Sequence, residues 1–340
     1  MMKNISKSLL LLLFVVVLCC GIYPLVLWGI GQGLFPFQAN GSIVKDNNGI
    51  PAGSLLIAQG FAKDQYFQPR PSACSYDASA SASAALAPSN YALRNRVATA
   101  LGPIVRYKGG PQAGQLVAPD VEKWFAADRF QGAPSIVAQW ADAHNALAVA
   151  WVSGDSTHGA YVGAWAASHP ADVAQFVKNN PSTPHPAPAD LAVVFFESFS
   201  KANPGRFPAS VTCTGADGKT TTEIEPVQSG ADIQSLFFDM WRTDHSQAEL
   251  QEVPSDMVTS SASGLDPHIT LASAEFQLDR VVAAWAGITK RDPTVLRAEI
   301  DSLVRDNASA PWFGLAGEKM VIVLKVNMEL RKKYAVPNAS

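Results

Sequence analysis

Charged residues are scarce in this sequence. Asp, Glu, Lys and Arg make up 16% of its 340 residues, whereas hydrophobic residues make up 48%. Ordinary soluble domains carry about 25% charged residues. The apolar excess excludes an intrinsically disordered chain, which lacks the side chains needed to offset the entropy lost on ordering. The net charge of −3 argues against nucleic acid as the main partner, because binding phosphates requires a basic surface.

Cysteine is also sparse, and four in the whole chain exclude a disulfide scaffold. Cys74 and Cys213 lie in segments of different composition, so a disulfide between them and two separate thiols both stay open. The nucleophile elbow G-x-S-x-G is absent as well. Asp266 and His268 therefore lack the serine that a hydrolase triad would need, and we do not expect an enzyme.

Residues 9–30 form a run of 22 residues without a charge. A helix of that length reaches about 33 Å, which spans a hydrocarbon core of about 30 Å. Pro24 is tolerated within such a span and kinks it, and Trp28 suits the interface at the far end. A cleaved signal peptide is the alternative, but its apolar region is shorter and ends in small residues. We therefore predict a retained transmembrane helix.

Lysines before the span set its orientation. Lys3 and Lys7 precede it, and no Lys or Arg follows before Lys45. By the positive-inside rule, residues 1–8 are cytoplasmic and the rest of the chain is translocated. The predicted location is the cytoplasmic (inner) membrane, with one crossing and the C-terminal domain outside, in the periplasm.

Three regions follow the span. We expect a buried strand within residues 53–61, a turn at 66–71, and a helix capped by Ser89 or Asn90. The predicted amphipathic helices of the middle region are 121–130, 134–152, 170–178, 187–201 and 231–242, with a β-hairpin at 211–224. In the last region Thr270 caps a helix through residue 287, Asp292 and Pro293 open another, and 320–326 is β-rich.

Several blocks in the two outer regions occur in the order of one known family. They are 23–25 (YPL), 35–42 (FPFQANGS), 53–59 (GSLLIAQ), 66–73 (YFQPRPSA), 88–90 (PSN), 256–269 (DMVTSSASGLDPHI), 277–281 (QLDRV) and 323–330 (VLKVNMEL). In these blocks the chain resembles the C subunit (KdpC) of the bacterial Kdp-type potassium-transporting ATPase.

The resemblance implies a non-catalytic accessory subunit of a high-affinity, ATP-driven potassium pump. Its implied partners are a channel-like subunit that carries K⁺ and a P-type subunit that hydrolyses ATP, beside the lipid bilayer. Its implied role is to assist assembly and to raise the ATP affinity of the hydrolytic subunit, as a catalytic chaperone. No covalently bound cofactor is implied, and ATP is expected only in complex with the hydrolytic subunit.

The chain departs from the family in its middle. Residues 31–108 and 252–337 then form a split, exported α/β (α+β) domain, and residues 109–251 form a mainly α-helical inserted module of unknown role. We expect this insertion to fold independently. It also supports the alternative function, a membrane-anchored extracytoplasmic binding module whose insert recognises a separate ligand.

Two groups of residues are candidate sites. Ser260, Ser261, Ser263 and Gly264 form a weak candidate for a nucleotide-binding loop, with a tight structural loop as the alternative. The candidates for contact with partner subunits are Pro24, Tyr66, Phe67, Arg70 and Asp266. A rigid turn with aromatic rings and a guanidinium is typical of an interface anchor, although Arg70 is equally compatible with a local salt bridge or carbonyl cap.

Two other motifs are rejected. The segment 215–220 (GADGKT) has too few residues between its glycines for a P-loop, so we predict a hairpin turn there. Histidines gather in the middle region, but none is paired at a spacing typical of a zinc site. We expect no metal site and exposed side chains at these positions, which are His144, His158, His169, His185 and His245.

Overall fold

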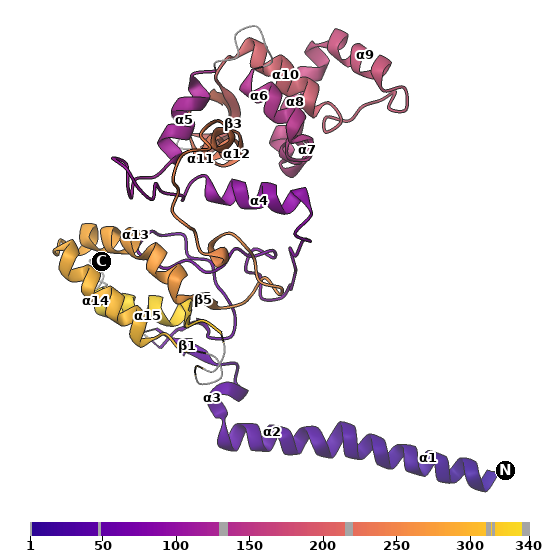
Figure 1. Cartoon of the computed structure of the whole chain (residues 1–340). Helices are drawn as coiled ribbons and strands as arrows, with labels where there is room; N and C mark the ends of the chain where they lie inside the picture. Colours follow the sequence, from indigo (N-terminus) through magenta and orange to yellow (C-terminus); the bar gives the residue numbers. More distant parts are fainter. Residues whose placement is uncertain are drawn as a thin grey trace. The chain divides into compact units, whose positions relative to one another are not determined.

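The structure is a computed structural model, and it describes residues 2–46, 49–128, 135–214, 220–310, 314 and 317–334. The chain divides into two compact units (Figure 1). Unit 1 consists of Met1–Ala85 and Pro254–Ser340, and unit 2 is the continuous segment Leu86–Val253.

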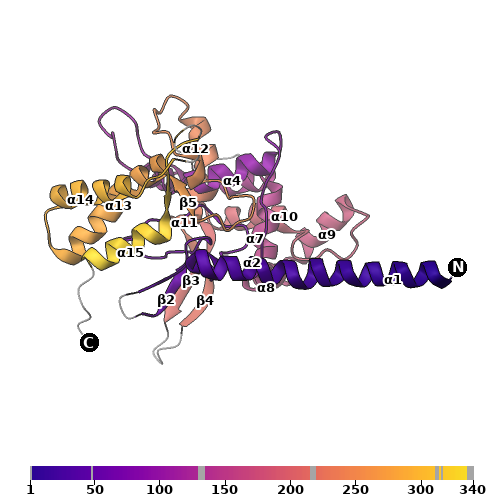
Figure 2. The same ribbon diagram turned by 90° about the horizontal axis from the view of Figure 1, so that it is seen from below.

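The chain begins with one long apolar helix. It consists of α1 (Met2–Val16), a π-helical turn η1 (Val17–Ile22) and α2 (Tyr23–Leu34), drawn in indigo in Figure 2. Residues Ile5–Leu34 are a candidate membrane span by length and mean hydropathy. Pro24 lacks an N–H to donate to the preceding turn, and the wider π turn lies where such a bond is lost. The helix stays continuous through this turn.

The rest of unit 1 is a small α/β fold. Its strand pairs are β1 (Ile43–Lys45) with β2 (Pro51–Ser54) and β5 (His268–Thr270) with β6 (Met320–Ile322), both antiparallel. Its helices are α3 (Pro36–Ala39), the short 3₁₀ turn η2 (Ser255–Met257), α13 (Leu271–Thr289), α14 (Pro293–Asp306) and α15 (Val323–Tyr334). Helices α13, α14 and α15 pack around Trp285, Leu296, Ile300 and Leu330, all of which are buried.

The predicted helix starts at both positions in this unit are confirmed. The Thr270 side chain accepts a hydrogen bond from the Ser273 N–H, and the Asp292 carboxylate accepts one from the Thr294 N–H. Each satisfies a donor that a helix N-terminus leaves free.

Two strand predictions in unit 1 are wrong. The strand expected within residues 53–61 ends at Ser54, a turn follows, and Leu56 is exposed. The strand expected at 320–326 lasts only to Ile322, where α15 begins. Val323, Val326, Asn327 and Leu330 are buried at intervals of three and four residues, so the helical period overrides the β propensity of the valines.

Unit 2 is mainly helical. Its elements are α4 (Tyr91–Leu101), α5 (Ala118–Ala126), α6 (Ile136–Ala143), α7 (Asn145–Gly154), α8 (Ser156–Ser168), α9 (Pro170–Asn179), α10 (Ala192–Ala202), β3 (Phe207–Thr214), β4 (Thr220–Val227), α11 (Ala231–Leu236) and α12 (Phe238–Asp244). Its core is aromatic: the Trp140 ring lies edge-on to Phe196 and Phe207, with ring centroids 5.2 and 5.6 Å away. Such pairs add to the hydrophobic stabilisation.

Most helices expected in the middle region are present with shifted bounds. The helix expected at 134–152 is two helices, because His144 ends α6, and the one expected at 231–242 breaks at Phe237. Helix α8 was not predicted. The hairpin is longer than predicted, pairing Phe207 with Val227 through to Thr214 with Thr220. Phe130 and the turn expected at 215–218 lie outside the described residues.

Helix α4 shares its core with the middle region. Ala98 and Leu101 pack against the buried cluster of unit 2, and Arg94 forms an ion pair with Asp239 of α12 at 2.9 Å. Gly102, just after α4, lies so close to the Gln234 carbonyl that a Cβ would fall 1.9 Å from its oxygen. The compact unit that contains the middle region therefore also includes α4 and begins at Leu86, before the insertion expected at 109–251.

Candidate partner-binding site

Three of the candidate interface residues, Tyr66, Phe67 and Arg70, lie on an extended segment, residues 66–72, which we call the clamped segment because two amide side chains hold it in place. The Phe67 N–H donates to Asn327 Oδ1, and Asn327 Nδ2 donates to the Phe67 carbonyl, both at 2.8 Å. The Gln68 N–H donates to Gln277 Oε1 at 2.7 Å, and Gln277 Nε2 donates back to the Gln68 carbonyl at 3.1 Å. The two amides supply the bonds that a neighbouring strand would supply, so the segment is ordered without a sheet.

Phe67 itself belongs to the core. Its side chain is 1% exposed and packs in the buried cluster of unit 1. The interface role expected for this residue is therefore wrong for its ring, which a partner cannot reach on the folded surface.

Tyr66 lies beside the core and is half-buried. Its ring meets Trp285 at 82° with a centroid distance of 6.3 Å. Arg280 of α13 donates to the Tyr66 carbonyl at 3.1 Å and to the Asp64 carbonyl at 2.7 Å. Burial lowers the pKa of the Arg280 guanidinium, because its charged form is less well solvated beneath the segment than in water. Both contacts fix the backbone that presents Tyr66.

Arg70 joins this segment to the serine-rich loop. Its Nε donates to the Thr259 carbonyl at 3.3 Å, and its Nη2 donates to Thr259 Oγ1 at 3.3 Å and to the Ser260 carbonyl at 3.4 Å. The Arg70 carbonyl in turn accepts from the Tyr76 hydroxyl at 3.0 Å. The guanidinium is thus a carbonyl cap within the chain, the local alternative to an interface anchor.

The loop that carries Ser263 and Gly264 is fastened from its other side as well. Ser72 Oγ donates to the Gly264 carbonyl at 2.6 Å, and the Ala82 N–H donates to the Ser263 carbonyl at 3.2 Å. Gly264 has φ +72, and a Cβ there would lie 3.0 Å from both the Ala82 carbonyl oxygen and Cys74 Sγ. Only glycine fits this turn without strain.

Three backbone N–H groups of the same loop donate to acceptors within the loop. The Gly264 N–H donates to the Ser261 carbonyl, the Leu265 N–H to Ser263 Oγ, and the Asp266 N–H to Ser261 Oγ. A phosphate-binding loop works by pointing free N–H groups at the anion. These three amides are already paired, which favours the structural alternative for Ser260, Ser261, Ser263 and Gly264.

Asp266 follows the loop and is paired with His268. Its Oδ1 accepts from the His268 N–H at 3.0 Å and lies 2.9 Å from His268 Nδ1. This side-chain hydrogen bond, with a smaller contribution from the Arg70 charge, lowers the pKa of Asp266. The carboxylate remains half-exposed, so Asp266 is still available to a partner. Pro24, the remaining candidate, lies on α2 within the candidate span.

A pocket of about 470 Å³ lies along the clamped segment. It is lined by Gly60, Phe61, Ala62, Gln68, Pro69, Pro71, Tyr76 and Met257. The lining is mainly apolar, with Gln68 and Tyr76 as its polar side chains, and none of these residues is charged. Its backbone is held by the amide and guanidinium contacts above. A rigid apolar pocket of this kind is suited to receive an apolar side chain from another protein.

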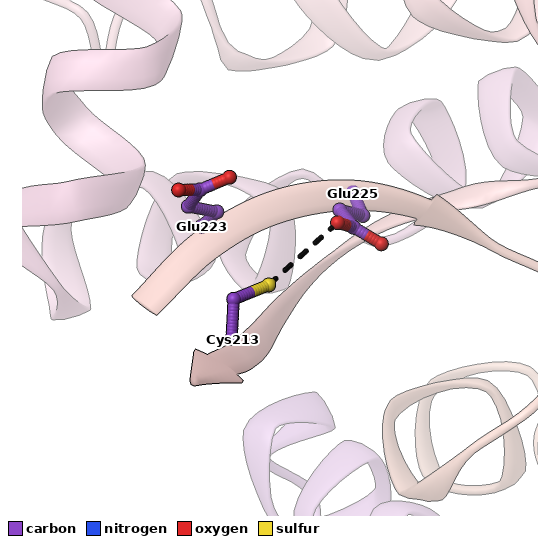
Figure 3. Close-up of side chains that lie close together, drawn as sticks. All are labelled: Cys213, Glu223 and Glu225. Carbon is purple, nitrogen blue, oxygen red and sulfur yellow. Dashed lines mark hydrogen bonds between the residues drawn. The ribbon is translucent and has the colours of Figure 1, made fainter. Parts of the chain in front are cut away.

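The structure also shows a donor cluster that the sequence did not suggest. Cys213 of β3 and Glu223 and Glu225 of β4 lie close together (Figure 3), with Cys213 Sγ 3.8 Å from Glu225 Oε1. A thiolate and carboxylates are donors that Zn²⁺ accepts. Both glutamates are exposed. Partial burial of the thiol, and then the charges of the two carboxylates, raise the pKa of Cys213. The four cysteines are free thiols in the structure.

Three histidines of unit 2 are helix C-caps. His144, His169 and His245 each follow the last residue of a helix, and each ring lies 2.9–3.3 Å by Nδ1 from the carbonyl of a tryptophan four residues earlier. Each also stacks on that tryptophan, which is Trp140, Trp165 or Trp241. His144 and His245 are half-buried, as is His158, so the expectation of exposed side chains is wrong for these three. The repeated spacing W-x₃-H was the sequence signal.

Comparison with known proteins identifies the family. The family model "KdpC: K+-transporting ATPase, c chain" matches residues 5–115 and 231–332, more than half of the chain. The chain belongs to this family. The unmatched residues between these two segments, 116–230, contain α5 to α10 and the β3–β4 hairpin, whereas α4, α11 and α12 lie in matched segments.

Curated relatives agree with this family. The chain is 44% identical to the "Potassium-transporting ATPase KdpC subunit" of Pseudomonas entomophila (strain L48) over 111 residues, 33% of this chain and 59% of the relative. It is 53% identical over 79 residues to the KdpC subunit of Caulobacter sp. (strain K31), 23% of this chain and 40% of the relative. Against the Myxococcus xanthus subunit the identity is 40%, over 31% of this chain and 58% of the relative. The chain thus spans about half the length of the curated relatives it matches.

Proposed function

We propose that this KdpC-family chain is a non-catalytic, membrane-anchored subunit of a K⁺-transporting ATPase. The observation that carries the proposal is the family match in two segments, which include both the apolar helix and the clamped segment with its serine loop. Its partners are the channel-like and the ATP-hydrolysing subunits of the pump. Its role is to support their assembly and to raise the ATP affinity of the hydrolytic subunit.

The N-terminal helix anchors the subunit in the cytoplasmic membrane. Lys7 lies before the apolar residues, and the first lysine after them is Lys45, which favours a cytoplasmic N-terminus and an exported domain. Pro24 and the π turn before it give this helix a local irregularity, a feature often found at functional sites. We infer that this part of the helix contacts a partner span.

The pocket along the clamped segment is the contact that we assign to a partner subunit outside the membrane. Asn327, Gln277 and Arg70 hold its wall in one conformation, so little conformational entropy is lost when a partner binds. Tyr66 lies on the clamped segment, and Asp266 follows the serine loop that Arg70 joins to this segment, so we assign them aromatic and polar contacts with the same partner. Specificity comes from the shape of this rigid surface.

We do not assign direct nucleotide binding to the serine loop. Its amides at Gly264, Leu265 and Asp266 are engaged within the loop, and the proposed topology separates it from cytoplasmic ATP. The effect on ATP affinity is therefore proposed to pass through contacts between subunits. Allosteric effects of this kind require only that this subunit bind the high-affinity state of its partner more tightly.

Co-purification tests the proposal. The tagged full chain, expressed in potassium-starved cells, is expected to bring down the channel-like and hydrolytic subunits. Ala62 lines the pocket and is exposed, so Ala62→Trp fills the pocket without disturbing the core. It is expected to lower recovery of the partners, whereas Ala272→Trp, at an exposed position of α13, is not. Absence of pump subunits with the wild-type chain would overturn the proposed function.

One observation favours a second property. A pocket in unit 2 is lined only by residues of the segment that the family model does not match. This supports ligand recognition by the inserted segment, which is compatible with a place in the pump.

A further inference from the structure

We propose that the pocket between α8 and α10 binds a small organic cation with a quaternary ammonium group. The pocket has a volume of about 350 Å³, within the range of roughly 300–1,000 Å³ typical of small-molecule sites. Each helix contributes one stripe of residues spaced by three and four positions. The stripes are Tyr161, Ala164, Trp165 and Ser168 with His169 after α8, and Phe195, Ser198, Phe199 and Ala202 with Asn203 after α10.

Aromatic rings dominate the lining. Phe195 meets Trp165 at 77° with centroids 5.6 Å apart, and meets Tyr161 at 89° with centroids 5.9 Å apart. Trp165 is held in place because its indole Nε1 donates to Ser198 Oγ at 3.3 Å and because His169 stacks on one face of the indole with centroids 5.1 Å apart, so that face is not available to a cation. Ring faces carry partial negative charge and attract cations, most strongly when the cation is shielded from water.

The end of one helix adds to the same potential. Asn203 is the C-cap of α10, so the C-terminus of this helix lies at the pocket, whereas His169 is both the C-cap of α8 and the N-cap of α9, so the opposite potentials of those two helix ends offset each other. A helix C-terminus carries roughly −0.5 of an elementary charge, which favours cations nearby. Lys201, in the last turn of α10, opposes this potential, but it is exposed and does not line the pocket.

The lining also selects the kind of cation. None of its ten residues is acidic, so the pocket lacks the oxygen anions that would replace the water shell of a small ion such as K⁺ or a primary ammonium. A quaternary ammonium has no N–H to satisfy and spreads its charge over methyl groups, which suits rings and small apolar side chains. Ser198 accepts from Trp165 and keeps its own O–H as a donor to a hydroxyl or carbonyl of the same ligand, whereas Ser168 and Asn203 already donate to the Trp165 and Phe199 carbonyls.

Choline chloride and its neutral carbon isostere, 3,3-dimethyl-1-butanol, form the decisive pair of probes. Binding to the purified full chain in maltoside detergent is measured by calorimetry and tryptophan fluorescence. Choline is expected to bind saturably and about tenfold more tightly than the isostere. Equal affinities, tighter binding of glucose than of choline, or no saturable binding of choline would each overturn the proposal.

Variants localise the binding. Trp165→Leu keeps an apolar side chain but removes the ring, and about a tenfold loss of choline affinity is expected. Ala202→Phe fills the pocket from an exposed position, so it tests the site even if Trp165→Leu unfolds the chain. Lys201→Gln is expected to tighten binding, and Tyr91→Leu, at an exposed ring of α4, is expected to change nothing. Full choline affinity in folded Ala202→Phe would overturn the assignment to this pocket.

A lipid headgroup and a free solute could both present this cation. Nanodiscs of phosphatidylcholine and of phosphatidylglycerol separate the two sources. Weaker apparent choline affinity in the former identifies the headgroup as a competitor, and equal affinity identifies a free solute.

Discussion

Asn327 and Phe67 are 260 positions apart in the chain, yet the Asn327 side chain pairs with both backbone groups of Phe67. The amide is 2% exposed, and the two bonds join α15 to the clamped segment. An Asn amide offers one donor and one acceptor side by side, which matches the N–H and C=O of an extended residue. This pair holds the candidate interface on the core.

Replacing Asn327 by Leu removes both bonds and leaves the buried N–H and C=O of Phe67 without partners. Each unsatisfied group costs about 1–3 kcal/mol, so the two groups together should cost unit 1 about 2–6 kcal/mol of stability. Near-ultraviolet circular dichroism during denaturation measures this. Arg331→Leu, at an exposed position of the same helix, is the control. Equal stabilities of the two variants would show that the amide pairing contributes little.

Gly264→Ala should loosen the serine loop. At φ +72 an L-residue is strained by about 1–2 kcal/mol, and the added Cβ also crowds Ala82 and Cys74. Faster hydrogen exchange is expected at Leu265 and Asp266, together with lower recovery of partner subunits. Gly287→Ala is the matched control, because a Cβ there meets nothing within 4 Å and α13 is continuous through it. Unchanged exchange in Gly264→Ala would contradict the role given to this turn.

Local signals in the sequence predicted the local features well. The caps at Thr270 and Asp292, the hairpin and most helices depend on neighbouring residues, and a single sequence carries that information. The strand expected at 320–326 failed because its valines have high β propensity while their burial follows a helical period. The β propensity of the valines therefore stabilises a strand less than the burial of one helix face stabilises α15.

The contacts of the candidate site could not be derived in the same way. The turn predicted at 66–71 is wrong, because Arg70 lies on an extended segment, and its carbonyl partners at Thr259 and Ser260 lie about 190 residues away in the sequence. Nothing local distinguishes such a cap from an interface anchor. The hydrogen bonds of Asn327 and Gln277 to the clamped segment also join residues 260 and 209 positions apart, so the local sequence does not reveal them. The W-x₃-H spacing, by contrast, was visible and marks helix ends.

Glu299 should make unit 1 sensitive to acid. Arg291, at 2.5 Å, Tyr334, at 2.7 Å, and Lys333, at 3.1 Å, lower the pKa of Glu299 from 4.5 to about 2. A carboxylate with a lowered pKa stabilises the fold above its ordinary pKa, and this stabilisation is lost as the pH falls from 4.5 towards 2. Glu299→Gln should therefore lose stability at neutral pH and flatten the pH dependence in that window.

Thermal unfolding across this range of pH checks the slope for Glu299→Gln. Glu318→Gln, at an exposed position in the same unit, is the control. A wild-type slope in Glu299→Gln would mean that other carboxyl groups cause the acid sensitivity.

Cys213 should react slowly with maleimide near neutral pH. Its pKa is raised by partial burial and by Glu225 and Glu223, so less of the reactive thiolate is present. In a background where the other three cysteines are serine, Glu225→Gln should speed the reaction severalfold, because one carboxylate is neutralised. Glu252→Gln, exposed elsewhere in unit 2, should leave the rate unchanged. A slower reaction in Glu225→Gln would contradict this electrostatic account.

Deleting residues 116–230, which the family model does not match, should destabilise what remains of unit 2. Phe237 of the matched part is fully buried, and its ring lies 4.5 Å from Phe125, 5.6 Å from Trp140 and 5.5 Å from Phe207 by centroid distance. All three partners are in the deleted segment, so the apolar side of α4, α11 and α12 would meet water. Such exposed patches cause aggregation.

The deletion variant is therefore expected to elute as aggregates in size-exclusion chromatography, and potassium uptake by cells that carry it should fall. Adding Phe237→Gln and Trp241→Lys to the deletion makes the newly exposed side of α11 and α12 more polar and should restore a soluble chain. Uptake that then recovers would assign the segment a role in covering this surface, whereas uptake that stays low in a soluble variant would make the segment part of transport. A monodisperse, fully active deletion variant without these substitutions would contradict the shared core, because only an independently folded module can be removed without exposing its neighbours.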